Sequence, residues 1–135
     1  MIALDTNILV RLVTNDHPAQ AKRSAALIDT GNALFVPLTV ALELEWVLRG
    51  AYSLDKSAIV RSFEALLSVR NINFERHSDI HHALQYYQSG FDFADALHHV
   101  GATGCKALAT FDKKFEKQAA RAKLKPPVFI PTPVA

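Results

Sequence analysis

Short apolar runs that alternate with longer amphipathic segments are the feature that most restricts the fold of this chain. The runs at residues 2–4, 33–36 and 106–109 have no helical period, and each ends at polar residues or a proline. The segments between them place apolar residues at helical spacing and end near glycines. Such alternation is typical of a parallel sheet covered by helices. We therefore predict an α/β fold, a three-layer α/β/α domain with a short, mostly parallel central sheet.

The boundaries of these elements can be estimated from caps and breakers. We expect strands at residues 2–4, 33–36, 72–75, 106–109 and 128–130. We expect helices at residues 8–13, 19–29, 39–49, 57–69, 79–88, 92–100 and 113–123, the third of them capped by Thr39. The sequence has no repeat, low-complexity tract or linker, and 135 residues suit one domain. We expect residues 1–135 to form a single domain.

The composition is that of an ordinary globular protein, half hydrophobic and 21% charged. The apolar beginning of the chain is interrupted by Asp5, Asn7 and Arg11 and lacks a basic start, so we expect no export signal. No apolar run has the length of a membrane span. The single cysteine, Cys105, is expected in the core, and a chain without disulfides suits the reducing cytoplasm.

The charge is small overall, +2, but it is unevenly distributed. From Lys106 onward the chain carries seven basic and two acidic residues, whereas the residues before it carry eight basic and eleven acidic ones. This asymmetry indicates a polyanionic partner such as RNA, or else a solvated helix face followed by a tail. Both interpretations stay open at this point.

Two acidic residues follow expected strands directly. Asp5 comes after the first strand, and Asp112 comes shortly after the strand at residues 106–109. In parallel sheets, functional groups gather beyond the carboxyl ends of the strands. If these two strands are neighbours, both carboxylates face the same crevice. Each residue also has a structural alternative, because an aspartate at such a position can cap the helix that follows.

The helix expected at residues 39–49 contains two glutamates with different surroundings. Glu45 precedes Arg49 by four residues, the spacing of a surface ion pair. Glu43 lies between apolar residues such as Val40 and Trp46 and has no basic residue three or four positions away. An enclosed carboxylate needs a partner, because burying it alone is costly. A metal ion or a distant basic side chain would serve.

A second pair of acidic residues stands at an expected helix start. Asp92 and Asp95 are three residues apart, and both suit the positive end of a helix dipole. The flanking residues Phe93 and Ala96 suggest that this turn packs against the core. Asp95 is then expected to lie in a crevice, although a purely structural role for both residues stays open.

Taken together, these motifs resemble those of the PIN domain. The motifs are Asp5-Thr6-Asn7, Glu43 in Glu-Leu-Glu-Trp-Val-Leu-Arg, Asp95 in Asp-Phe-Ala-Asp-Ala-Leu, and Asp112 in Thr-Phe-Asp-Lys-Lys-Phe. More narrowly, the chain resembles the VapC-type toxins of bacterial toxin–antitoxin pairs. The resemblance extends from Ile2 to about Phe129, with the motifs in the expected order.

The resemblance implies an endoribonuclease that hydrolyses RNA phosphodiester bonds. It makes Asp5, Glu43, Asp95 and Asp112 the catalytic carboxylates that hold Mg²⁺ or Mn²⁺. Thr6, Asn7 and Thr110 would be polar residues that support these carboxylates, and Asp92 would either support the metal or cap its helix. The resemblance also implies a homodimer neutralised by a small antitoxin, for which Trp46 and Phe63 are candidate contacts, although core packing is the simpler use of each.

The chemistry fits these residue types, because Mg²⁺ prefers oxygen ligands and metal-assisted hydrolysis needs no other nucleophile. Two alternatives stay open: a catalytically inactive module that binds RNA or protein, and a phosphoaspartate phosphatase. The phosphatase would usually have a second aspartate where Asn7 stands. The adjacent histidines at 81–82 and 98–99 point in different directions on a helix, so neither pair chelates one ion. No glycine-rich phosphate loop is present.

Overall fold

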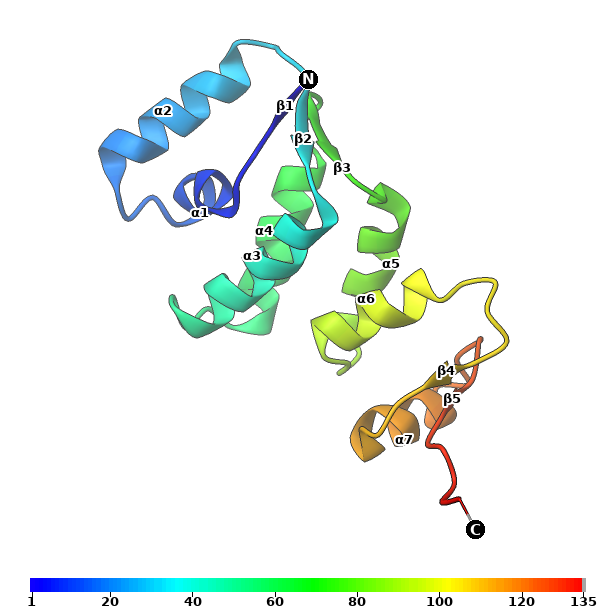
Figure 1. Ribbon diagram of the computed structural model, residues 1–135. Coiled ribbons are helices and arrows are strands. Elements are labelled where there is room, and N and C mark those ends of the chain that lie inside the picture. The colour runs from blue at the N-terminus through cyan, green and yellow to red at the C-terminus, as the bar shows by residue number, and fades with distance from the viewer. Residues whose placement is uncertain (135) are drawn as a thin grey trace. The chain divides into compact units, whose positions relative to one another are not determined.

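The computed structural model describes residues 1–134 as seven helices and five short strands (Figure 1). In chain order the elements are β1 (Ile2–Ala3), α1 (Thr6–Thr14), α2 (Pro18–Asp29), β2 (Leu34–Val36), α3 (Leu38–Gly50), α4 (Lys56–Leu67), β3 (Ile72–Phe74), α5 (His77–Gln88), α6 (Phe93–Gly101), β4 (Leu108–Ala109), α7 (Lys113–Arg121) and β5 (Val128–Phe129). This alternation confirms the α/β class and the short parallel sheet. The contacts within the chain define two compact units, Met1–Ile80 and His81–Ala135.

The first unit contains a three-stranded parallel sheet in the order β1-β2-β3. Leu34 of β2 stands opposite Ile2 of β1 on one side and Ile72 of β3 on the other. Each connection between neighbouring strands contains two helices, α1 and α2 in the first and α3 and α4 in the second (Figure 1). Because the strands are parallel, their carboxyl ends point the same way, and α1 and α3 both begin just beyond them.

The core of the first unit comes from the apolar sides of these helices and from the central strand. Leu9 of α1, Leu34 of β2, Leu44 of α3 and Phe63 of α4 are completely buried. Burying such side chains is the main favourable contribution to folding, about 1.5–3 kcal/mol each. Phe63 is therefore a core residue and is excluded as a surface contact, whereas Trp46 of α3 is 64% exposed.

The second unit contains the parallel pair β4–β5 together with α6 and α7. Its aromatic side chains pack edge to face, Tyr87 on Phe93 and Phe91 on Phe115. The buried His99 of α6 has one ring nitrogen 2.9 Å from the carbonyl oxygen of Pro126. The hydrogen-bonded neighbour of β4 among the described residues is β5, so the expected adjacency of β4 and β1 stays a prediction.

The expected cap of α3 and the expected burial of Cys105 are both wrong. Thr39 does not cap α3: Pro37 precedes the helix without a side-chain cap, and Glu75 accepts the N–H of Leu38 at 2.8 Å instead. Cys105 is exposed, not in the core, because it lies in the turns that join α6 to β4.

Among residues 1–134, every helix is too short or too polar to serve as a membrane span.

Candidate active site

In the first unit, Asp5 and Glu43 are joined through one threonine. Asp5 is the N-cap of α1, and its Oδ1 accepts the backbone N–H of Thr6 at 2.7 Å. The Thr6 side chain donates its hydroxyl proton to Oε1 of Glu43, which is 37 residues away in sequence. Thr6 itself is 5% exposed, so its position is set by the packing around it. The hydroxyl bond therefore holds the two carboxylate-bearing segments in a defined arrangement.

The sheet explains why these two residues meet. Asp5 follows β1, and α3, which carries Glu43, follows β2. The two strands are parallel neighbours, and Leu4 still donates its N–H to the carbonyl of Phe35 across them at 2.8 Å. The rule that functional groups collect beyond the carboxyl ends of parallel strands thus applies to Asp5 and Glu43, a pair that the sequence analysis did not link by this rule.

The two glutamates of α3 have exposures opposite to those expected. Glu43, expected to be enclosed by apolar neighbours, is exposed. Glu45, expected in a surface ion pair, is 3% exposed, although its pair with Arg49 is present at 2.8 Å. The predicted i,i+4 pairing is confirmed, and the predicted environments of both glutamates are wrong. Because Glu43 is exposed and bound by Thr6, its carboxylate is accessible to a ligand from solvent.

In the second unit, Asp92, Asp95 and Asp112 line one cavity of about 340 Å³. Asp92 is the N-cap of α6 and accepts the N–H of Asp95 at 3.1 Å. Asp112 is the N-cap of α7 and accepts the N–H of Phe115 at 3.0 Å, while Thr110 accepts the N–H of Asp112 at the same distance. The expected supporting role of Thr110 is therefore a bond to the backbone of Asp112.

The electrostatics of this cavity are unfavourable for carboxylates alone. Partial burial is the largest cause that raises the pKa of the Asp95 carboxyl above its ordinary value. The negative charges of Asp92 and Asp112 raise it further, and His98 opposes the shift. A cation in the cavity would offset both the cost of burying the charged carboxylate and the repulsion between the aspartates, which is a physical reason to expect one.

Each of the three capping aspartates uses only one of its two carboxylate oxygens in the cap. Asp5, Asp92 and Asp112 each use one carboxylate oxygen for a helix N–H, and the other makes no hydrogen bond within residues 1–134. The Asp95 carboxylate makes none at all in the same part of the chain. Free carboxylate oxygens are the donors that Mg²⁺ and Mn²⁺ prefer, so the aspartates of each unit have chemistry that suits a divalent ion.

No three His, Cys, Asp or Glu side chains within residues 1–134 lie close enough together to form a ready-made metal centre. The assignment of Asp5, Glu43, Asp95 and Asp112 as metal ligands therefore stays a prediction. The expected supporting role of Thr6 agrees with its hydrogen bond to Glu43. The Asn7 side chain makes no hydrogen bond to the carboxylate of Asp5 or of Glu43.

The cavity of the second unit also contains residues that were not singled out as site residues. Lys114 and Gln118 of α7 line it together with the aspartates. Gln118 donates from Nε2 to the carbonyl of Gly90 at 3.2 Å and so ties α7 to the loop before α6. The only signal in the sequence was the basic character of the segment after Lys106, which does not distinguish one lysine from another.

The family model of the PIN domain matches residues 2–121, and a search of curated proteins finds no match. The matched range includes every acidic residue described above. The chain therefore belongs to the PIN domain family, whose members are in general nucleases and usually act with divalent metal ions.

Proposed function

We propose that this PIN domain is a metal-dependent endoribonuclease that hydrolyses RNA phosphodiester bonds. The observation that carries the proposal is the bond from Thr6 to Glu43, which links this glutamate to the segment that carries Asp5. A buried threonine that orients an exposed glutamate has little structural purpose of its own, because an exposed carboxylate is well solvated without it. Holding ligands in a fixed geometry is a purpose that explains it.

In this proposal Asp5, Glu43, Asp95 and Asp112 hold Mg²⁺ or Mn²⁺. A divalent ion supplies an activated water and stabilises the charge that develops on the phosphate. The residues of the chain orient the groups around that chemistry. The helix N–H groups fix one oxygen of Asp5 and of Asp112, and the bond from Thr6 fixes Glu43, so these carboxylates lose little freedom when a ligand binds.

We further propose that the protein is the toxin of a type II toxin–antitoxin pair, acting in the cytoplasm as a homodimer. The support is the set of motifs that resembles VapC-type toxins. The exposed Trp46 is a candidate contact for a partner chain, since large exposed aromatic side chains are enriched at interfaces. A small antitoxin would inhibit by placing an arginine on the carboxylates, where it pairs in bidentate fashion and excludes the metal.

The test is cleavage of a labelled single-stranded RNA in Mg²⁺, in Mn²⁺ and in EDTA. Asp5→Asn removes the charge but keeps the shape and the capping ability, so we expect a loss of about 100-fold or more in kcat/KM. Asp55→Asn is the control, because Asp55 is likewise the N-cap of a helix, α4. Its Oδ1 accepts the N–H of Ala58, three residues on, at 2.8 Å, whereas Asp5 accepts the N–H of the next residue.

The two variants separate catalysis from capping. Asp55→Asn is expected to cleave within about twofold of the wild type, since asparagine caps helices as well as aspartate does. Equal cleavage by Asp5→Asn and the wild type would refute the proposal. Cleavage that persists in EDTA would refute its metal dependence.

A further inference from the structure

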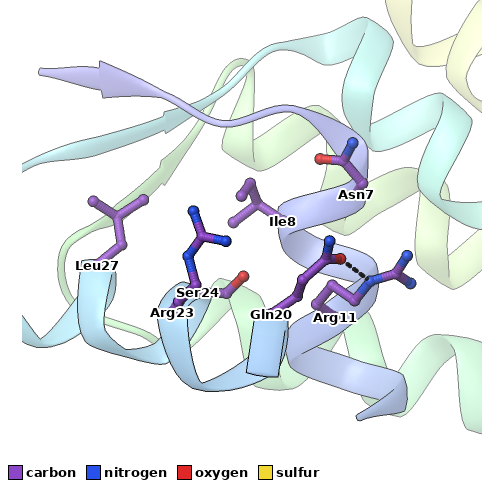
Figure 2. A pocket seen from close by; sticks show the side chains of 7 residues that line it. All are labelled: Asn7, Ile8, Arg11, Gln20, Arg23, Ser24 and Leu27. Carbon is purple, nitrogen blue, oxygen red and sulfur yellow. Dashed lines mark hydrogen bonds between the residues drawn. The ribbon is translucent and has the colours of Figure 1, made fainter. Parts of the chain in front are cut away.

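A second polar cavity, of about 360 Å³, lies between α1 and α2 in the first unit (Figure 2). Its charged and polar lining consists of Asn7, Arg11, Gln20, Arg23 and Ser24, and no acidic residue lines it. Figure 2 shows the two guanidinium groups on the two sides of the Gln20 amide. The lining is therefore cationic and rich in hydrogen-bond donors.

The two arginines differ in how far their charge is satisfied. Arg11 lies 3.1 Å from Asp16 and donates to the hydroxyl of Tyr52 at 3.0 Å, so an internal carboxylate offsets its charge. Arg23 is exposed and has no ion pair or hydrogen bond within residues 1–134. The cavity thus has one uncompensated guanidinium, the group that best matches the oxygens of a phosphate.

Two further groups are arranged as donors toward the cavity. Nε of Arg11 donates to Oε1 of Gln20 at 2.6 Å, which fixes the side-chain amide and leaves its NH₂ group to donate elsewhere (Figure 2). Ser24 is 3% exposed, yet its hydroxyl makes no hydrogen bond within the described chain. The hydroxyl oxygen itself is not buried, because Nδ1 of His99 is the one buried side-chain polar atom without a partner among residues 1–134. It is therefore open to the cavity that it lines and can donate to a ligand there.

We propose that this cavity binds a phosphate of the RNA strand next to the one that is cleaved. Asn7 and Arg11 stand on α1, whose N-cap is Asp5, and Arg11 is six residues beyond that cap, about 9 Å along the helix axis. An anion in the cavity therefore lies within reach of a strand whose neighbouring phosphate is at Asp5. The substrate class rests on the proposed function, whereas the preference for an anion rests on the lining alone.

The experiment measures equilibrium binding of a short fluorescein-labelled single-stranded RNA by anisotropy, in EDTA so that no cleavage occurs, at several salt concentrations. Arg23→Gln is expected to raise Kd about tenfold and to lower the slope of log Kd against log salt by about one. Ser24→Ala is expected to raise Kd by a smaller factor without a change in slope. Lys22→Gln is the matched control, because Lys22 is an exposed cation on the same helix that does not line the cavity.

The outcomes separate this proposal from the proposed function. A large effect of Arg23→Gln with an effect of less than about twofold for Lys22→Gln supports the phosphate site, even if Asp5→Asn turns out to cleave RNA as well as the wild type. Equal effects of the two substitutions would overturn it, since they would report only the general charge of the helix. An unchanged Kd in Arg23→Gln would overturn it too and would leave the cavity to another anion, such as an acidic peptide.

Discussion

Replacing Thr6 by valine tests the contact on which the candidate site depends. Valine keeps the size and the branching of threonine, so the buried position stays filled, but it removes the hydroxyl that donates to Glu43. Thr6→Ser is the complementary change, because it keeps the hydroxyl and removes only a methyl group. The two variants together separate the hydrogen bond from the packing.

The expected size of the effect follows from the charge and exposure of the partners. A hydrogen bond to a carboxylate contributes about 1.5–3 kcal/mol, but Glu43 is exposed and water replaces the lost donor, so we expect the free energy of unfolding to fall by only about 1 kcal/mol. The effect on function is larger, because a ligand that loses its orienting partner typically costs 10–100-fold in metal affinity or activity.

The assay is a titration of RNA cleavage with Mn²⁺, combined with direct measurement of Mn²⁺ binding by electron paramagnetic resonance. Thr6→Val is expected to weaken Mn²⁺ binding about tenfold or more, and Thr6→Ser is expected to stay within about threefold of the wild type. Wild-type Mn²⁺ affinity in Thr6→Val would refute the reasoning. An equal loss in both variants would also refute it, since packing and not the hydroxyl would then be responsible.

The remaining predictions concern the other acidic residues. Asp95→Asn is expected to abolish cleavage while leaving the melting temperature at pH 7 unchanged or a few degrees higher. The folded state raises the pKa of the Asp95 carboxyl, so the unfolded state loses its proton first as the pH rises. The cost of this carboxylate to the stability of the wild type is therefore absent in acid and grows as the pH rises through the folded-state pKa. The gain in thermal melting is small, since Asp95 is only partly buried and its charge favours the start of α6. Glu45→Gln is expected to lower the free energy of unfolding in urea by about 1–3 kcal/mol, because it loses the ion pair to Arg49. Glu43→Gln is expected to do the opposite and to lose RNA cleavage with little change in stability. A Glu43→Gln variant that unfolds early but cleaves normally would contradict the assignment.

The sequence predicted the order of helices and strands well, because the periodicity and the breakers act locally. Proline after β2, aspartates before α1 and α6, and apolar runs without helical period each determine a boundary from a few neighbouring residues. The start of α3 could not be predicted in the same way. The side chain of Glu75, 37 residues further along the chain, accepts the N–H of Leu38 at the start of the helix. This distant partner takes the place of the cap that was expected from Thr39.

The environment of a side chain was harder to predict than its element. Glu43 and Glu45 have similar apolar neighbours in sequence, and only the packing of α3 decides that Glu45 faces the core while Glu43 faces solvent. Cys105 was expected to be buried because it precedes the strand expected at residues 106–109 and has no obvious histidine partner nearby. It stands in a turn instead, and turns lie on the surface. The polar cavity between α1 and α2 left no recognisable pattern in the sequence, because its lining residues come from two separate helices and share no motif.

The structural and catalytic interpretations of the aspartates turn out not to exclude each other. Asp5, Asp92 and Asp112 all cap helices, as the simpler interpretation of each required. A cap uses one carboxylate oxygen and restrains the side chain, and in each of these three residues the other oxygen makes no hydrogen bond within residues 1–134. Capping is therefore a means of orienting a ligand at low entropic cost, and evidence that an aspartate caps a helix does not weaken the case that it binds a metal. The two roles separate only under substitution by asparagine, which preserves the cap and removes the charge.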